Sequence, residues 1–178
     1  MSMEKYNKIH FIGIGGISMS SLAEILKSKG KTITGSDGVA SNVTKALENI
    51  GIQVSIGQKA ENITPDTDLI VYTAAVKEDN PELMAARASG IETVDRAALV
   101  GMMMLEYKFP LSVAGTHGKT TTSSLVTEIF LEANTNPTVS IGGILPSIKG
   151  NYKVGGEAYF ILETCEFCDS FLKFNPHG

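Results

Sequence analysis

Short apolar segments typical of buried β-strands alternate with helical segments along the N-terminal half of the chain. The helical segments carry apolar residues every three or four positions, as Met19, Leu22, Ala23 and Leu26 do. The strand-type segments read KIHFIGI, KTITGSD, IQVSIG, TDLIVYTAA and IETVD. Such alternation is typical of β-α-β units, which join by right-handed crossovers into a parallel sheet with helices on both faces. The sequence therefore predicts an α/β fold.

The same pattern begins again in the second half. A helix predicted for about residues 96–106 leads to the strand YKFPLSVAG, a glycine-rich loop and a second long helix. In that helix Val126, Ile129, Phe130 and Ala133 predict one apolar stripe, and the strands TVSIGG and EAYFILE follow. We place a domain boundary near residues 107–109. One helix and about three strands are too few to enclose a core, so the second domain is expected to be incomplete and the chain a fragment.

Composition excludes several classes of protein. With 15 basic against 19 acidic residues the net charge is −4, and no basic stripe suited to nucleic acid occurs. Two cysteines are too few for a disulfide-stapled secreted fold. The apolar run near the N-terminus is interrupted by glycines, unlike a signal peptide, and no other run approaches the length of a membrane span. The sequence predicts a cytoplasmic protein without membrane insertion.

The segment FIGIGGIS places Gly13, Gly15 and Gly16 between the first strand and the first helix. Glycines there allow a tight turn and let backbone N–H groups approach a diphosphate at the helix N-terminus. The dinucleotide-binding pattern has a third glycine where this chain has Ser18. The match is partial, and a purely structural turn is the alternative.

Asp37 ends the second strand, 22 residues after Gly15. A carboxylate at this position can accept a hydrogen bond from a ribose hydroxyl. The alternative is that Ser36 or Asp37 caps the following turn or helix, as such residues commonly do. Both interpretations stay open on the sequence.

The segment SVAGTHGKTTT is a sharper signal, because it follows a predicted strand and opens a helix. Gly115 and Gly118 free the backbone to wrap phosphate oxygens, Lys119 can place its ammonium on the β- and γ-phosphates, and the Thr120 hydroxyl can ligate Mg2+. Two residues separate Gly115 from Gly118, where the usual P-loop has four. The order of strand, loop and helix is nevertheless the required one.

The segment ILETCEFCDSF places acidic residues after a buried-looking strand. Either Glu163 or Glu166 can supply a second Mg2+ ligand, since Mg2+ prefers oxygen donors; surface acids, including Asp169, are the alternative. Cys165 and Cys168 form a C-x-x-C, but no pair of histidines completes a zinc site. Free, partly buried thiols are the simpler interpretation.

In this order, HFIGIGGISMSSLAEIL, TGSD, VYTAAVKEDNPEL, VAGTHGKTTT and ETCEFCDSFLKFNP resemble the Mur ligases over the whole chain. The resemblance implies a Rossmann-like UDP-substrate domain over residues 1–108 and the truncated start of a P-loop ATPase α/β domain over residues 109–178. It implies ATP-dependent joining of L-alanine to UDP-N-acetylmuramate through an acyl phosphate, in the synthesis of peptidoglycan precursors. A sibling ligase that adds a tripeptide is a further possibility.

The resemblance also assigns residues. The UDP-substrate would lie on Gly13, Gly15, Gly16, Ser18 and Asp37. ATP would lie on Gly115, Thr116, His117, Gly118, Lys119, Thr120 and Thr121, with Lys119 as the catalytic residue. Mg2+ would be held by Thr120 and Glu166, with Glu163 as the second choice for the acid.

The sequence departs from the family pattern in two places, and two other functions are alternatives to the ligase. Ser18 and Ser20 stand where the family often has glycine, and Gln58 stands where it often has a histidine near the uracil. An NAD(P)-binding oxidoreductase domain would explain the first loop and Asp37, but it leaves the loop around Lys119 unexplained. A non-catalytic nucleotide-binding fragment of a ligase is the third hypothesis, and the one that we expect for this chain taken alone.

Overall fold

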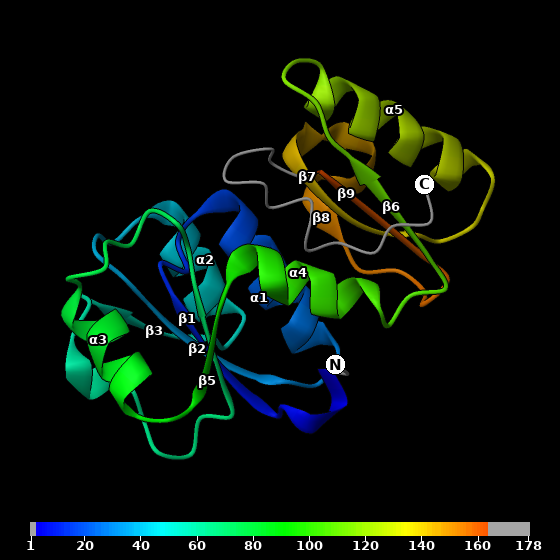
Figure 1. Cartoon of the computed structure of the whole chain (residues 1–178). Helices are drawn as coiled ribbons and strands as arrows, with labels where there is room; N and C mark the ends of the chain where they lie inside the picture. Colours follow the sequence, from blue (N-terminus) through cyan, green and yellow to red (C-terminus); the bar gives the residue numbers. More distant parts are fainter. Residues whose placement is uncertain (1–2, 164–178) are drawn as a thin grey trace. The chain divides into compact units, whose positions relative to one another are not determined.

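The computed structural model describes residues 3–163, and these form two compact units (Figure 1). One unit comprises Glu4–Leu99; the other begins at Val100 and includes Met3. This division falls within helix α4 (Arg96–Met104), whereas the boundary near residues 107–109 stays a prediction. Among residues 3–163 no helix has the length and apolar character needed to cross a bilayer.

The N-terminal unit contains a five-stranded sheet in which every pairing is parallel. Its strand order is β3-β2-β1-β4-β5. The strands are β1 (Lys8–Ile12), β2 (Thr32–Asp37), β3 (Gln53–Ile56), β4 (Leu69–Tyr72) and β5 (Glu92–Asp95). The direction of winding reverses between β1 and β4, which is the topology of doubly wound dinucleotide-binding folds.

Helices cover both faces of this sheet (Figure 1). They are α1 (Ile17–Ser28), α2 (Asn42–Asn49) and α3 (Pro81–Ala88), with short 3-10 turns η1 (Met3–Lys5) and η2 (Ala60–Asn62). The four residues predicted to form the apolar face of α1 are all buried. On the other side, Leu83 and Ala86 of α3 pack against Ile12 and Ile70 of the sheet. The predicted α/β class with a Rossmann-like parallel sheet is confirmed.

Sequence-local caps fix where two of these helices begin. Ser41 and Thr44 form a capping box at the start of α2, and Asn80 accepts hydrogen bonds from the N–H groups of Glu82 and Leu83 at the start of α3. Pro81 occupies the first turn of α3, as predicted, where its missing N–H leaves no helical hydrogen bond unmade.

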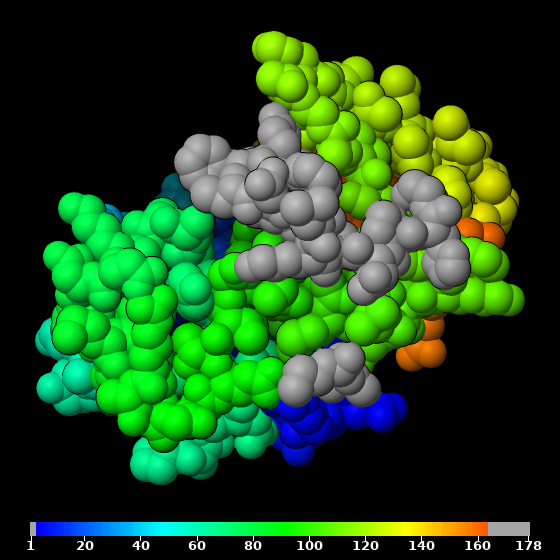
Figure 2. Space-filling model, in the orientation of Figure 1, coloured from blue at the N-terminus to red at the C-terminus, as the bar shows by residue number. Residues whose placement is uncertain are grey.

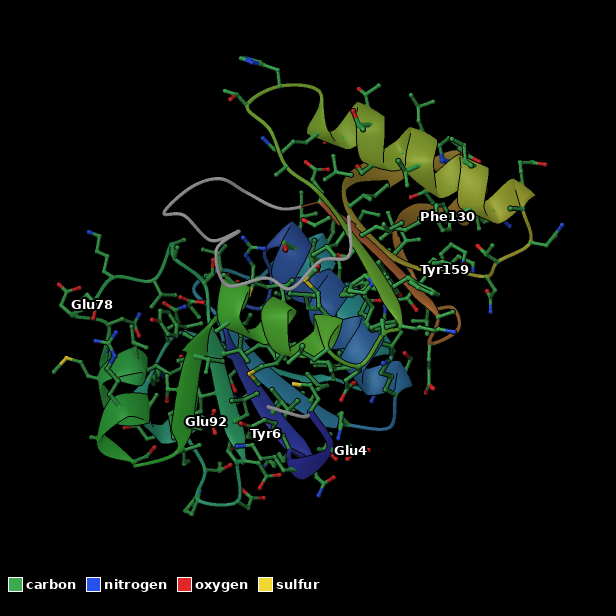
Figure 3. All side chains as sticks on the ribbon, turned by 45° about the vertical axis from the view of Figure 1, so that its right-hand side comes forward. Glu4, Tyr6, Glu78, Glu92, Phe130 and Tyr159 are labelled. Carbon is green, nitrogen blue, oxygen red and sulfur yellow. The ribbon has the colours of Figure 1, made fainter. Side chains whose placement is uncertain are left out.

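The second unit has a four-stranded mixed sheet in the order β6-β9-β7-β8. Its elements are β6 (Phe109–Val113), α5 (Lys119–Glu132), β7 (Thr138–Leu145), η3 (Pro146–Ile148), β8 (Gly150–Lys153) and β9 (Tyr159–Glu163). β8, which the sequence pattern did not predict, pairs antiparallel to β7, while the other pairings are parallel. Phe130 of α5 meets the ring of Tyr159 edge to face, with centroids 4.9 Å apart (Figure 3).

The predicted apolar stripe of α5 is partly wrong. Val126 and Phe130 pack against the sheet core, but Ile129 is 66% exposed and Ala133 is also exposed. The buried face runs instead through two hydroxyl residues, Ser123 and Thr127, whose side chains hydrogen-bond to carbonyls of the preceding turn. A hydroxyl that is hydrogen-bonded in this way can be buried at little cost in free energy. The face of α5 that packs on the sheet is therefore formed by Ser123, Val126, Thr127 and Phe130 and not by the predicted apolar residues alone. α5 contributes to the surface of the second unit (Figure 2).

Asp68 fastens the start of β1 to the sheet and makes the stability of this unit pH-dependent. Its Oδ2 accepts hydrogen bonds from the backbone N–H groups of Asn7 and Lys8, both 2.8 Å away. The hydrogen bonds from Lys8 and Asn7 lower the pKa of the Asp68 carboxyl below its usual value. A carboxyl whose pKa is depressed by folding stabilises the protein above its unfolded-state pKa, about 3.9, and loses that contribution as the pH falls through the folded-state value.

We therefore expect Asp68→Asn to lower the free energy of unfolding at pH 7 and to leave it nearly unchanged at pH 2–3. Asparagine keeps a carbonyl oxygen that can accept the hydrogen bonds but removes the charge. Urea unfolding of the two proteins between pH 2 and 7 measures the difference. A difference that stays constant over this range would contradict the role given to the charge.

Candidate functional site

A cleft of about 240 Å3 opens at the carboxyl ends of the strands of the N-terminal sheet. Its lining comes from the end of β2 and from the segments that follow β1, β3 and β4: Gly13, Gly16, Asp37, Gln58, Thr73, Ala75 and Val76. The cleft therefore lies at the topological switch point between β1 and β4. In doubly wound sheets this is where ligands bind.

The glycine loop is held by backbone hydrogen bonds to the end of β2. The N–H groups of Gly13 and Ile14 both donate to the carbonyl of Ser36, at 2.8 and 2.9 Å. α1 then begins after Gly16, which has no side chain to cap the helix. A helix N-terminus carries partial positive charge, which favours an anion beside it.

Gly15 approaches Asp37 more closely than a side chain permits. Its N–H donates to Oδ2 of Asp37 at 2.9 Å, and a Cβ at Gly15 would lie 2.8 Å from that oxygen and 3.2 Å from Cγ2 of Thr44. The other oxygen of Asp37 accepts from the N–H of Val39 at 3.2 Å. Asp37 thus lines the cleft and closes the following turn, while Ser41 caps α2. The contact that closes the turn is thus observed, and the hydrogen bond to a ribose stays a prediction.

Gln58 reaches the cleft from the segment after β3. Its side-chain carbonyl accepts a hydrogen bond of 2.7 Å from the Asn80 amide, and Asn80 at the same time caps α3. The Gln58 amide is therefore held by an element that is itself fixed to the sheet. An amide group with both donor and acceptor atoms is suited to the edge of a base.

A buried polar network lies on the α3 side of the sheet. The Glu82 carboxylate, which is 0% exposed, contacts Nε2 of His10 at 2.8 Å and accepts a hydrogen bond of 2.6 Å from the Ser36 hydroxyl. Nδ1 of His10 lies 2.8 Å from the Thr34 hydroxyl. Since the Ser36 carbonyl also receives the two N–H groups of the glycine loop, the network fixes the residue that supports the loop.

The loop between β6 and α5 makes a glycine turn directly before the helix. Gly118 immediately precedes the helix with φ +75°, a left-handed conformation that side chains disfavour. The ammonium of Lys119 folds back onto the carbonyl of Gly115, 2.5 Å away. Thr116, His117 and the first-turn residues Thr120 and Thr121 are exposed.

Glu163 ends β9, next to the loop strand β6, where it is paired with Val113. Its Oε1 accepts a hydrogen bond of 3.0 Å from the Thr120 hydroxyl, and its Oε2 accepts from the N–H of Gly142 at 2.9 Å and from the Ser123 hydroxyl at 3.4 Å. The structure thus brings two of the predicted Mg2+ ligands together. Glu166, the favoured acid, lies outside the described residues, as do Cys165, Cys168 and Asp169.

Sequence reasoning missed two features of these sites. Gly142 and Ser123 hold Glu163 in place, and only the pairing of β9 beside the loop strand reveals them. Arg96 follows β5 directly and donates from Nη1 to the Ser18 hydroxyl in the first turn of α1, at 3.2 Å. Its place right after a strand of the parallel sheet was the available signal.

The sequence pattern of the Mur ligase family, catalytic domain, matches residues 8–108, more than half of the chain. The chain belongs to the Mur ligase family. The family resemblance seen in the sequence is therefore confirmed. The matched region includes the cleft and the glycine loop of the N-terminal unit.

Relatives of this Mur ligase chain are much longer than it is. It is 58% identical over 94% of its length to the UDP-N-acetylmuramate–L-alanine ligase of Agathobacter rectalis, and it spans 37% of that relative. It superposes on the UDP-N-acetylmuramate-alanine ligase of Thermotoga maritima with a TM-score of 0.86 and 36% identity, covering 95% of this chain and 39% of the other. The UDP-N-acetylmuramate:L-alanyl-γ-D-glutamyl-meso-diaminopimelate ligase of Neisseria meningitides superposes with a TM-score of 0.85 and 27% identity. That match covers 96% of this chain and 58% of the other.

Proposed function

We propose that this chain is the UDP-substrate-binding and ATP-binding part of a ligase that joins L-alanine to UDP-N-acetylmuramate. The observation that carries the proposal is the pair of phosphate-type loops, each between a parallel strand and a helix, in a chain of the Mur ligase family. The 58% identity to a relative named for L-alanine supports the alanine-adding branch over a peptide-adding one.

In the N-terminal unit, the backbone of Gly13, Gly15 and Gly16 and the N-terminus of α1 bind the diphosphate, with Ser18 in the first helical turn. The uncapped helix end stabilises the negative charge without a cluster of basic residues. Asp37 and Gln58 face the nucleoside from the ends of β2 and β3. The size of the cleft, about 240 Å3, suits part of such a ligand, with the remainder extending into solvent.

In the second unit, residues 115–121 hold the phosphates of ATP. Backbone N–H groups around Gly118 point at phosphate oxygens, and Lys119 moves its ammonium from the Gly115 carbonyl to the β- and γ-phosphates. His117 and Thr116 shape the exposed loop, and Thr121 lies in the first turn of α5. We assign no proton transfer to His117.

The oxygen donors beside this loop fit Mg2+. The Thr120 hydroxyl and the Glu163 carboxylate lie 3.0 Å apart, so both can bind one small cation while water and phosphate oxygens complete its coordination. Bound there, Mg2+ would neutralise charge on the transferring phosphoryl group. Gly142 and Ser123 keep the Glu163 carboxylate aimed at Thr120.

The proposed reaction transfers the γ-phosphoryl group of ATP to the muramate carboxylate. The amine of L-alanine then attacks the acyl phosphate, so that an amide forms and phosphate leaves. Lys119 stabilises charge that develops during the transfer, and the two loops hold the substrates in place, which matters more here than a general acid–base pair. The product is a peptidoglycan precursor, so we propose that the protein acts in the cytoplasm. Its role would be in cell-wall biogenesis, and through it in cell shape and cell division.

An NAD(P)-binding oxidoreductase domain is the second candidate, because the β3-β2-β1-β4-β5 order and the acid at the end of β2 suit it too. Thermal unfolding of the 178-residue chain separates the two. A ligand that binds only the folded state at 100 times its Kd adds about 2.7 kcal/mol of stability. We expect UDP-N-acetylmuramate and UDP to raise Tm and NAD or NADP to leave it unchanged; the reverse result would favour the oxidoreductase.

For the ATP loop, we expect Lys119→Ala to weaken binding of Mg-ATP roughly tenfold to a hundredfold, the effect of losing a charge-assisted contact to phosphate. Calorimetry on the 178-residue chain measures it. Lys153→Ala is the matched control, since Lys153 lies on the edge strand β8 and its ammonium donates to Asn136. Equal ATP affinity in the Lys119 and Lys153 variants would remove Lys119 from the site.

A further inference from the structure

Arg96 directly follows β5, in a row of residues that come straight after neighbouring strands of the parallel sheet. Ile12 pairs with Tyr72 and Tyr72 pairs with Asp95, so these three residues end their strands at one level across the sheet. The next residue of each chain segment is Gly13, Thr73 or Arg96. Two of these, Gly13 and Thr73, line the cleft, and Arg96 follows at the same level one strand further on.

The Arg96 side chain lies at the N-terminal end of α1. Its Nη1 donates to the Ser18 hydroxyl at 3.2 Å, and Ser18 is the second residue of that helix. The side chain of Arg96 is half-buried. Among residues 3–163 no ion pair joins Arg96 to a carboxylate, and its side chain donates to the Ser18 hydroxyl.

This placement runs against the usual electrostatics of helices. The N-terminus of a helix carries partial positive charge, and cations are favoured at the other end. The first turn of α1 contains no acidic residue. A guanidinium held beside that end is therefore unfavourable by itself, and an anion that contacts both groups removes the conflict.

We propose that Arg96 is a ligand of the diphosphate in the UDP-substrate site. The inference rests on the proposed function and adds the charged group that the glycine loop lacks. A guanidinium presents paired N–H donors that match phosphate oxygens, and it stays charged at any physiological pH. Arg96 thus makes the site selective for a nucleoside diphosphate over the uncharged nucleoside. The muramate group of the full substrate carries a second anion, its carboxylate. UDP lacks this carboxylate, so binding of UDP tests the contact with the diphosphate alone.

The test uses calorimetry of the 178-residue chain with UDP and, as the uncharged reference, NMR titration with uridine. Arg96→Gln removes the charge and the paired guanidinium donors while keeping a polar side chain with an amide N–H group. We expect UDP affinity to fall roughly tenfold to a hundredfold, uridine affinity to stay the same, and Arg96→Lys to recover part of the loss. Added NaCl should weaken UDP binding more in the wild type than in Arg96→Gln.

Arg87→Ala is the matched control, because that guanidinium pairs with Glu78 on the surface and is not among the residues that line the cleft. It should bind UDP like the wild type. Unchanged UDP affinity in Arg96→Gln, or equal losses for UDP and uridine, would overturn the assignment; the second result would mean that Arg96 only supports the fold. If the wild type binds UDP no better than uridine, the diphosphate site itself is wrong, a distinct outcome.

Discussion

Replacing Glu82 with alanine is expected to lower the free energy of unfolding by about 3–5 kcal/mol, the usual cost of breaking a buried polar pair. Glu82 is fully buried, and its carboxylate is the shared partner of His10 and Ser36. Without it, the imidazole and the hydroxyl are left in the core with one hydrogen-bonding partner fewer. The loss also reaches the glycine loop, because Ser36 supports it through two backbone hydrogen bonds.

Urea unfolding followed by circular dichroism measures this effect, with Glu78→Ala as the control. Glu78 precedes the same helix but is exposed and pairs with Arg87 at the surface, so its removal should change little. Glu82→Gln should fall between the two, since an amide retains some of the hydrogen bonds. If Glu82→Ala and Glu78→Ala unfold at the same urea concentration, the buried network does not stabilise the protein.

The sequence predicted the parallel architecture because short strand-type segments alternate with helical ones. β1 and β4 are largely apolar, as buried parallel strands are, while Pro81 in the first turn of α3 and Gly90 just past its end are residue types favoured at those positions. β8 escaped prediction because its residues, GNYK, show no apolar alternation. It is an edge strand defined by pairing with β7 rather than by its own pattern.

The candidate sites divide in the same way. The two glycine loops could be predicted, since their chemistry is local: glycines, a lysine and hydroxyls within a few residues. The contacts of His10 with Glu82, 72 residues apart, and of Arg96 with Ser18, 78 residues apart, could not. The first contact depends on how α3 packs on the sheet, and the second on the first turn of α1 lying beside the start of α4. The sequence around a polar residue does not show which distant residue such packing brings to it.

Gly15→Val should abolish binding of UDP, with an affinity loss of at least about a hundredfold, equivalent to roughly 2.7 kcal/mol. A Cβ at this position would lie 2.8 Å from the Asp37 carboxylate and 3.2 Å from Thr44, so Asp37 must leave the Gly15 N–H or the loop must shift. Both changes alter the loop on which we propose that the diphosphate binds. The close neighbour is the end of a carboxylate side chain, which can rotate away, so the fold should survive.

Gly38→Val gives the matched control. Gly38 follows Asp37 directly, but a Cβ there meets nothing within 4 Å. Calorimetry should find wild-type UDP affinity in this variant and none in Gly15→Val, while thermal unfolding without ligand shows that both are folded. A folded Gly15→Val that binds UDP as the wild type does would exclude the loop from the site, because no diphosphate could approach this backbone past a valine side chain.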